Sequence, residues 1–297
     1  MKLLTAFCAL LIATAFVRHS PATIVYSVAG STYSQNFDSL ASTGPDNAWQ
    51  NDGTLPGWSL YRITAANNPA PFAIDTYYAS SGITDNGRFY SLGNSSDRAL
   101  GGVGANKFGT DADFIDTTMG QTLGWIAASF SNGTGSPLTN ITFNYDGEQW
   151  RNGGNDNGVA QAMAFEYAFG SDFATIPSNA WNVPTGDFTF SSPTNSGLDG
   201  PLNGNLAANS AADRGGTISN LDWQPGATLW LRWIERNDTF IDHGLAIDNF
   251  EFSASATISA VPEASAVACG GIACIAIGGV HLLRRRLGRW PKSGVNA

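Results

Sequence analysis

Cysteine is missing from the part of this chain that would fold. Of 297 residues only three are cysteines, Cys8, Cys269 and Cys274, and all lie close to one end or the other. The segment 23–258 therefore has no disulfide and must be held by its core, which a domain of this length can do. It also has a single histidine, so zinc ligation by cysteine and histidine clusters is excluded.

Basic side chains are also scarce between the two ends. Of the 15 Lys and Arg residues, two precede residue 23 and five follow residue 260, which leaves eight. The same interval holds 23 of the 24 acidic residues, so its net charge is −15. Nucleic acid and anionic lipid both require a basic surface, and we expect neither as a partner.

The sequence also lacks the residues of most nucleophilic mechanisms. His243 is the one histidine available as a general base in this segment, and no Gly-x-Ser-x-Gly motif accompanies it. We therefore expect no enzyme, with no catalytic residue, and interpret His243 as a residue that orders the loop before the last strand.

The first residues have the composition of a secretory signal peptide. Lys2 precedes an apolar run from Leu3 to Val17, and small residues follow at Ser20 and Ala22. Such a segment is too short for a lasting membrane span. We predict a signal peptide over residues 1–22, with cleavage by signal peptidase after Ala22.

The other end contains the only long apolar run. Val261, Pro262, Glu263 and Ala264 introduce a stretch over 264–283, close to the roughly 20 residues that cross a bilayer. Three arginines follow it directly: Arg284, Arg285 and Arg286. Arginines remain on the cytoplasmic side, so the C-terminus is expected there and everything before the helix is expected outside.

This order of a Pro-Glu dipeptide, one span and an arginine cluster resembles the PEP-CTERM sorting signal, over residues 259–290 with a tail at 291–297. The resemblance implies recognition and cutting by exosortase, a membrane transpeptidase, and release from a membrane anchor to the cell surface or matrix of bacteria that make exopolysaccharide. Ala264 stands where the family has a second proline. An ordinary, uncut tail anchor is the alternative.

Between the two ends, short segments alternate apolar and polar residues in the manner of half-buried strands. They lie at 141–145, 162–169, 188–190, 229–234 and 250–252. We predict an all-β chain with a single antiparallel β-sandwich, a jelly roll, over 23–258. The Gly- and Asn-rich stretches 152–158 and 195–212 are expected to be loops. Trp230 and Trp233 fall on opposite faces of one strand, so at most one is expected in the core.

Three phrases resemble a bacterial jelly-roll module. They are Tyr145-Asp-Gly-Glu-Gln-Trp-Arg151, Asp242-His-Gly-Leu-Ala-Ile-Asp-Asn-Phe250, and the early Asn36-Phe-Asp38. In such folds the first and last strands lie side by side. The resemblance implies that Asp38 and Asp248 meet and hold one structural calcium, a hard cation that takes oxygen ligands. The alternative is that Asp248 accepts hydrogen bonds from a turn.

Other side chains are candidates for ligand binding or for ion pairs. Four tryptophans have loop-forming neighbours and are predicted to stack sugars of exopolysaccharide, the alternative being core packing: Trp49, Trp58, Trp181 and Trp223. A half-buried arginine requires a carboxylate, which predicts a Glu148/Arg232 or a Glu235/Arg151 pair. Alternatively, Glu148 belongs to a glycosidase carboxylate pair.

These observations favour an exported, non-enzymatic surface or matrix protein. A carbohydrate-binding module acting on exopolysaccharide is the second hypothesis. A carboxylate-dependent glycoside hydrolase is the third.

Overall fold

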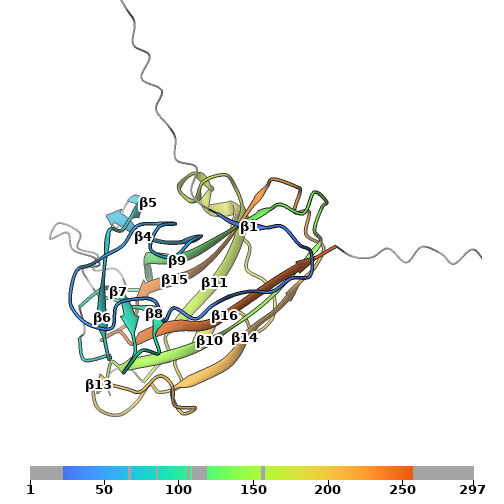
Figure 1. Cartoon of the computed structure of the whole chain (residues 1–297). Helices are drawn as coiled ribbons and strands as arrows, with labels where there is room; N and C mark the ends of the chain where they lie inside the picture. Colours follow the sequence, from blue (N-terminus) through green and yellow to red (C-terminus); the bar gives the residue numbers. More distant parts are fainter. Residues whose placement is uncertain are drawn as a thin grey trace, which may run out of the picture. The chain divides into compact units, whose positions relative to one another are not determined.

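The strands of this chain follow the alternating segments of its sequence. A computed structural model describes residues 23–65, 68–84, 86–105, 108, 119–154 and 158–256. Sixteen strands and two short 3-10 turns lie within these ranges (Figure 1), and the prediction of an all-β chain is confirmed. The predicted signal peptide with Ala22, and the sorting segment with its span at 264–283, lie outside the described residues. No helix in the described ranges is long and apolar enough to cross a membrane.

The larger of the two sheets has nine strands, and its centre is the last strand of the described chain. In order across the sheet they are β13 (Gly200–Pro201), β10 (Asn140–Asn152), β16 (Gly244–Ser255), β8 (Ala99–Val103), β7 (Arg88–Leu92), β6 (Thr76–Ser80) and β3 (Asn47–Ala48). Two more strands pair with this path, β14 (Ser210–Ile218) with β10 and β2 (Tyr33–Gln35) with β16.

The smaller sheet has seven strands. Its order is β12 (Phe190–Ser191), β11 (Ala162–Phe169), β15 (Thr228–Asn237), β9 (Gln121–Asn132), β4 (Trp58–Ala65) and β5 (Asn68–Ala73), with β1 (Ile24–Tyr26) paired to β9. Two pairs are parallel, β1 with β9 and β6 with β7. All other strand pairs of the described residues are antiparallel, in agreement with the predicted class.

Aromatic side chains from both sheets form the core between them. Trp58 on β4 stacks on Trp233 of β15 with ring centroids 5.8 Å apart. Phe250 on β16 meets both tryptophans edge-on, at 5.4 and 5.7 Å. Such pairs stabilise by about 0.5–1.5 kcal/mol each beyond the area that they bury. A core of this kind explains how the domain can fold without cysteine.

Several predicted segments differ in length from the strands found. The strand predicted at 162–169 matches β11, whereas those at 141–145, 229–234 and 250–252 are parts of longer strands. The stretch 195–212, predicted as a loop, contains β13 and the start of β14. Glycine allows β14 to approach β10 closely: a Cβ at Gly215, whose φ is +140°, would lie 2.1 Å from the carbonyl oxygen of Phe143. Glycine at this position therefore permits close strand pairing just beyond the stretch that we predicted to be a loop.

Candidate binding face

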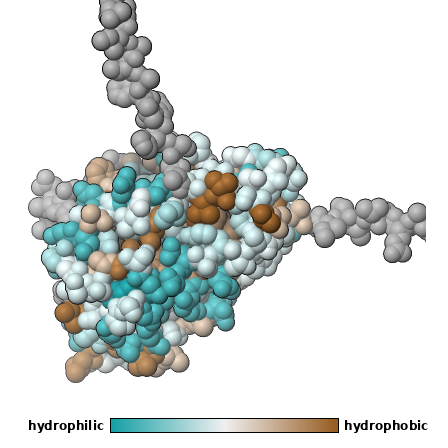
Figure 2. All heavy atoms as spheres, in the orientation of Figure 1, coloured by the Kyte–Doolittle hydropathy of each residue, from teal (hydrophilic) through white to brown (hydrophobic). Residues whose placement is uncertain are grey.

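The outer face of the larger sheet is polar because its two central strands alternate. On β16, Ile247 packs in the main core, whereas Ala246 packs with Trp150 on the other side of the sheet. Asp248 follows on that outer side. Figure 2 shows hydrophilic residues gathered over β16, β10 and β14. We call this surface the polar face; its carboxylate and amide side chains are Asp38, Asp97, Asp146, Glu148, Asp248, Asn249 and Glu251.

Asp248 is the most deeply buried acid of the polar face, with 2% of its surface exposed. Burial raises the pKa of Asp248 to about 8, and the charges of Glu148, Asp97 and Asp38 raise it as well. Its Oδ1 accepts a hydrogen bond from the N–H of Asn249 at 2.7 Å, which lowers the pKa. Asp248 therefore keeps its proton at neutral pH.

The predicted neighbourhood of Asp38 and Asp248 is present. The segment that ends in Asp38 follows β2, and β2 pairs antiparallel with β16, Gln35 opposite Phe250. The strand nearest the N-terminus, β1, instead belongs to the smaller sheet. Early and late segments of the chain thus lie side by side, as the resemblance implies.

The same two residues do not complete a calcium site. Asp38 already accepts hydrogen bonds from the Arg98 N–H at 2.9 Å and from the Asn36 amide at 2.7 Å. Calcium takes 6–8 oxygen ligands, and the described residues contain no group of three metal-ligating side chains. Calcium at this position stays a prediction, which an unchanged melting temperature in EDTA would exclude.

The predicted ion pairs are wrong. Arg232 pairs with Glu166, its direct neighbour across β15 and β11, and Arg151 pairs with Asp199. Glu148 cannot reach Arg232, because the two side chains project from the outer faces of different sheets. Glu148 instead accepts a hydrogen bond from the indole N–H of Trp150 at 2.8 Å.

Glu148 shares the polar face with Asp248. Burial raises the pKa of Glu148 to about 7, and the charges of Asp97 and Asp146 raise it further. Glu235, the other carboxylate of the predicted pairs, is also buried, and burial raises its pKa well above its ordinary value. The glycosidase hypothesis for Glu148 stays untested by this geometry.

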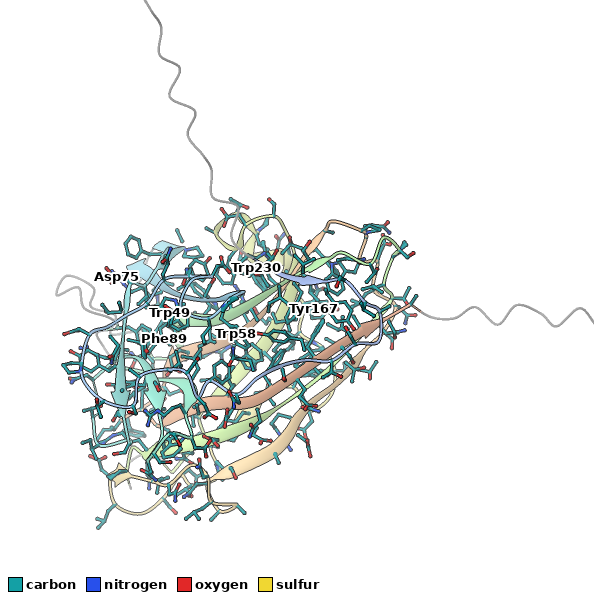
Figure 3. The ribbon with its side chains drawn as sticks, in the orientation of Figure 1. Trp49, Trp58, Asp75, Phe89, Tyr167 and Trp230 are labelled. Atoms are coloured by element: carbon teal, nitrogen blue, oxygen red, sulfur yellow. The ribbon has the colours of Figure 1, made fainter. Side chains whose placement is uncertain are left out.

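Three of the four candidate tryptophans cannot stack a sugar. Trp49 and Trp58, labelled in Figure 3, are 4% and 0% exposed, and Trp223 is 0% exposed. Gly, Pro and Asn beside them mark turns, but these turns direct the rings inward. Trp181 alone is partly exposed, and the Arg232 guanidinium already lies 3.7 Å from its ring centre. Trp230 and Trp233 are both buried, against the expectation of at most one.

His243 orders the loop before the last strand, as predicted. The Nδ1 atom of the His243 ring accepts a hydrogen bond from the Gly153 N–H at 2.8 Å. The backbone N–H of His243 donates to the side-chain oxygen of Gln161. Burial lowers the pKa of His243 to about 4, so the ring is neutral. These contacts hold residues 153 and 161 against the start of β16.

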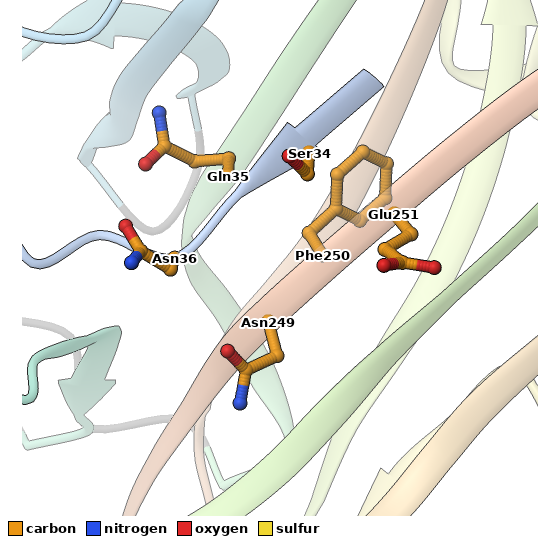
Figure 4. A pocket seen from close by; sticks show the side chains of 6 residues that line it. All are labelled: Ser34, Gln35, Asn36, Asn249, Phe250 and Glu251. Carbon is orange, nitrogen blue, oxygen red and sulfur yellow. The ribbon is translucent and has the colours of Figure 1, made fainter. Parts of the chain in front are cut away.

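A hollow of about 370 Å³ opens where β2 meets β16 (Figure 4). It is lined by Ser34, Gln35, Asn36, Asn249, Phe250 and Glu251. Asn249 in β16 and Phe37, two residues after β2, have positive φ values of 47° and 56°. Regular strand geometry is therefore interrupted in both segments beside the hollow. Backbone strain of this kind concentrates at binding and catalytic sites.

Sequence reasoning missed this hollow. The acids at 38 and 248 were identified, but Ser34, Asn249 and Glu251 were not. A signal was present, since the alternation of Leu245 to Ile247 is broken by the Asp248-Asn249 doublet before it resumes at Phe250. Such a break indicates a bulge, and bulges are frequent beside functional sites.

Comparison with known proteins finds no match: no family model, no curated protein and no solved structure is detectably similar to this chain.

Proposed function

We propose that this chain is an exported, non-enzymatic protein of the cell surface or extracellular matrix. Signal peptidase removes residues 1–22, and an exosortase-type transpeptidase processes the segment 259–290. The domain between them is a jelly roll. The pairing of β2 with β16, which joins early and late strands in one sheet, supports that topology.

The observation that carries the proposal is where the described strands begin and end. β1 begins at Ile24, two residues after the proposed cleavage at Ala22. β16 ends at Ser255, six residues before Val261. Processing at both sites would therefore leave every described strand intact, as release of a finished domain requires.

Mass analysis of the protein recovered from its own host tests this proposal. Intact mass and peptide mapping are expected to find an N-terminus at Thr23 and a C-terminus between Val261 and Ser265. A chain that retains Trp290 would identify an ordinary tail anchor instead. A chain that retains Lys2 would contradict export through a cleaved signal peptide.

A second function, glycan binding, is favoured by the hollow at β2 and β16. Its volume lies in the range of small-molecule sites, and amide, hydroxyl and carboxylate groups line it. The buried tryptophans remove the aromatic mode of sugar binding at three positions, so the hollow replaces them as the candidate site. Retention of the full-length chain on the exopolysaccharide of its host would support this function, and a chain that washes through would contradict it.

A further inference from the structure

The hollow offers polar groups that the protein itself does not use. Ser34, Asn36, Asn249 and Glu251 are all exposed there. Within the described residues, no hydrogen bond or ion pair engages the Glu251 carboxylate. The Asn249 amide nitrogen donates to Asp146 at 3.0 Å, which leaves its carbonyl oxygen as an acceptor. A ligand in the hollow would therefore meet two acceptors, a hydroxyl and a second amide.

The charge around the hollow has one sign. Glu251 lines it, and Asp38 and Asp146 accept hydrogen bonds from the lining amides of Asn36 and Asn249. Arg98, whose backbone N–H donates to Asp38, directs its guanidinium to Ser91 and to the Gly93 carbonyl, away from the surface. An anionic ligand would be repelled by these three carboxylates, whereas a cation would be attracted.

The same groups are held in place before any ligand arrives. The amide of Asn36 is fixed by its hydrogen bond to Asp38. Asn249 is held by its donation to Asp146 and by the left-handed backbone at that residue. Groups that are already ordered lose little conformational entropy on binding.

We propose that this hollow binds amine-bearing sugar units of a polysaccharide. Glu251 pairs with the protonated amine, while Ser34, Asn36 and Asn249 hydrogen-bond to ring hydroxyls. The inference rests on the proposed glycan-binding function and specifies its ligand class. It also explains why an acidic domain could adhere to a polysaccharide: the ligand supplies the opposite charge.

The test compares two oligosaccharides, one with free amines and one in which each amine is acetylated and therefore uncharged. Titration calorimetry is carried out with the full-length chain in detergent micelles, at mildly acidic pH where the sugar amine is protonated. Glucosamine hexamer is expected to bind about fivefold more tightly than N-acetylglucosamine hexamer, which is the most that one exposed ion pair typically contributes. Raising the salt concentration is expected to remove most of that difference.

Glu251→Gln separates this site from general attraction to an acidic protein. The variant is expected to lose about fivefold in affinity for the amine form and to bind the acetylated form as before. Asp75→Asn is the matched control, because it removes one exposed acid between β5 and β6 and is expected to change neither affinity.

Equal binding of the two hexamers would overturn the inference, as would no binding of either. An unchanged affinity in Glu251→Gln would overturn the assignment to this hollow. The salt titration of the unaltered chain gives an answer even if that variant does not fold. Retention on host exopolysaccharide is measured separately, so the general glycan-binding function can survive the loss of the amine-specific site.

Discussion

The outer faces of the two sheets differ in what covers them. The smaller sheet is covered by residues 170–181, where Phe173 stacks on Tyr61 at 4.2 Å and meets Trp230 edge-on at 5.5 Å. The Trp230 indole donates to the Gly170 carbonyl at 3.0 Å. The larger sheet also buries an apolar cluster around Trp150 on its outer side, but beside that cluster its carboxylates and a hollow lie outward. One face thus contributes to stability, and the other keeps polar groups available for a ligand.

Among the substitutions that test this comparison, truncation of Trp230 is expected to change the free energy of unfolding most. Trp230→Ala is expected to lower the free energy of unfolding by about 3–5 kcal/mol, because it leaves a cavity beneath Phe173. Chemical unfolding measures the loss. Trp181→Ala, at a partly exposed ring, is the control and should cost less. A loss below about 1 kcal/mol at Trp230 would show that residues 170–181 do not seal this face.

On the polar face, removing an acid should stabilise the protein. The pKa of Asp248 is raised from 3.8 to about 8, so between these values the folded state holds a proton that the unfolded state releases. The contribution of Asp248 to the free energy of unfolding is therefore fully present below about pH 4. It decreases as the pH rises toward 8. Asp248→Asn removes this loss and is expected to raise the free energy of unfolding at pH 8 by on the order of 2 kcal/mol.

Unfolding at pH 5, 6, 7 and 8 measures the difference. The variant should lose stability with rising pH less steeply than the unaltered chain. Asp75→Asn, at an exposed acid, should leave the slope unchanged. Parallel curves for Asp248→Asn and the unaltered chain would be incompatible with a buried, protonated Asp248.

The ion pair between Glu166 and Arg232, on the outer face of the smaller sheet, is expected to contribute less to the free energy of unfolding. Glu166→Gln is expected to destabilise by about 1–2 kcal/mol, since it leaves the half-buried Arg232 with aromatic rings, those of Trp181, Trp125 and Phe173, in place of a carboxylate. A double-mutant cycle with Arg232→Met isolates the pair. A coupling energy near zero would mean that the aromatic rings alone hold Arg232.

Glu251→Gln should have the smallest effect on stability. An exposed side chain without a partner typically changes the free energy of unfolding by no more than about 0.5 kcal/mol. A melting curve of the variant checks this. A large loss would show that Glu251 has a structural role, and the polar face would then differ less from the covered face than its contacts indicate.

The sequence predicted strands better than it predicted surfaces. Period-two alternation located β11 from Ala162 to Phe169, because alternation depends on local residues alone. Burial of Trp230 depends on residues 170–181, which fold back over the sheet, and no local pattern reports that contact. Turn-forming neighbours likewise indicate a bend at Trp58 without showing which way the ring points.

Partners across strands were the least predictable feature. Alternation assigns Arg232 to a face, but its partner depends on which strand lies beside β15. That strand is β11, and Glu166 is 66 residues away in the sequence. The neighbourhood of Asp38 and Asp248 was anticipated only because a resemblance supplied the topology.

The place of β16 in the larger sheet also governs when the domain can form. This strand lies between β10 and β8 and also pairs with β2, yet it is the last of the described strands in the sequence. Until residue 255 is available, β10 and β8 have no common neighbour and β2 has no partner in its sheet. Pairing over such long sequence separations is slow to form. The described strands of the larger sheet therefore cannot all pair until the chain has been synthesised as far as residue 255.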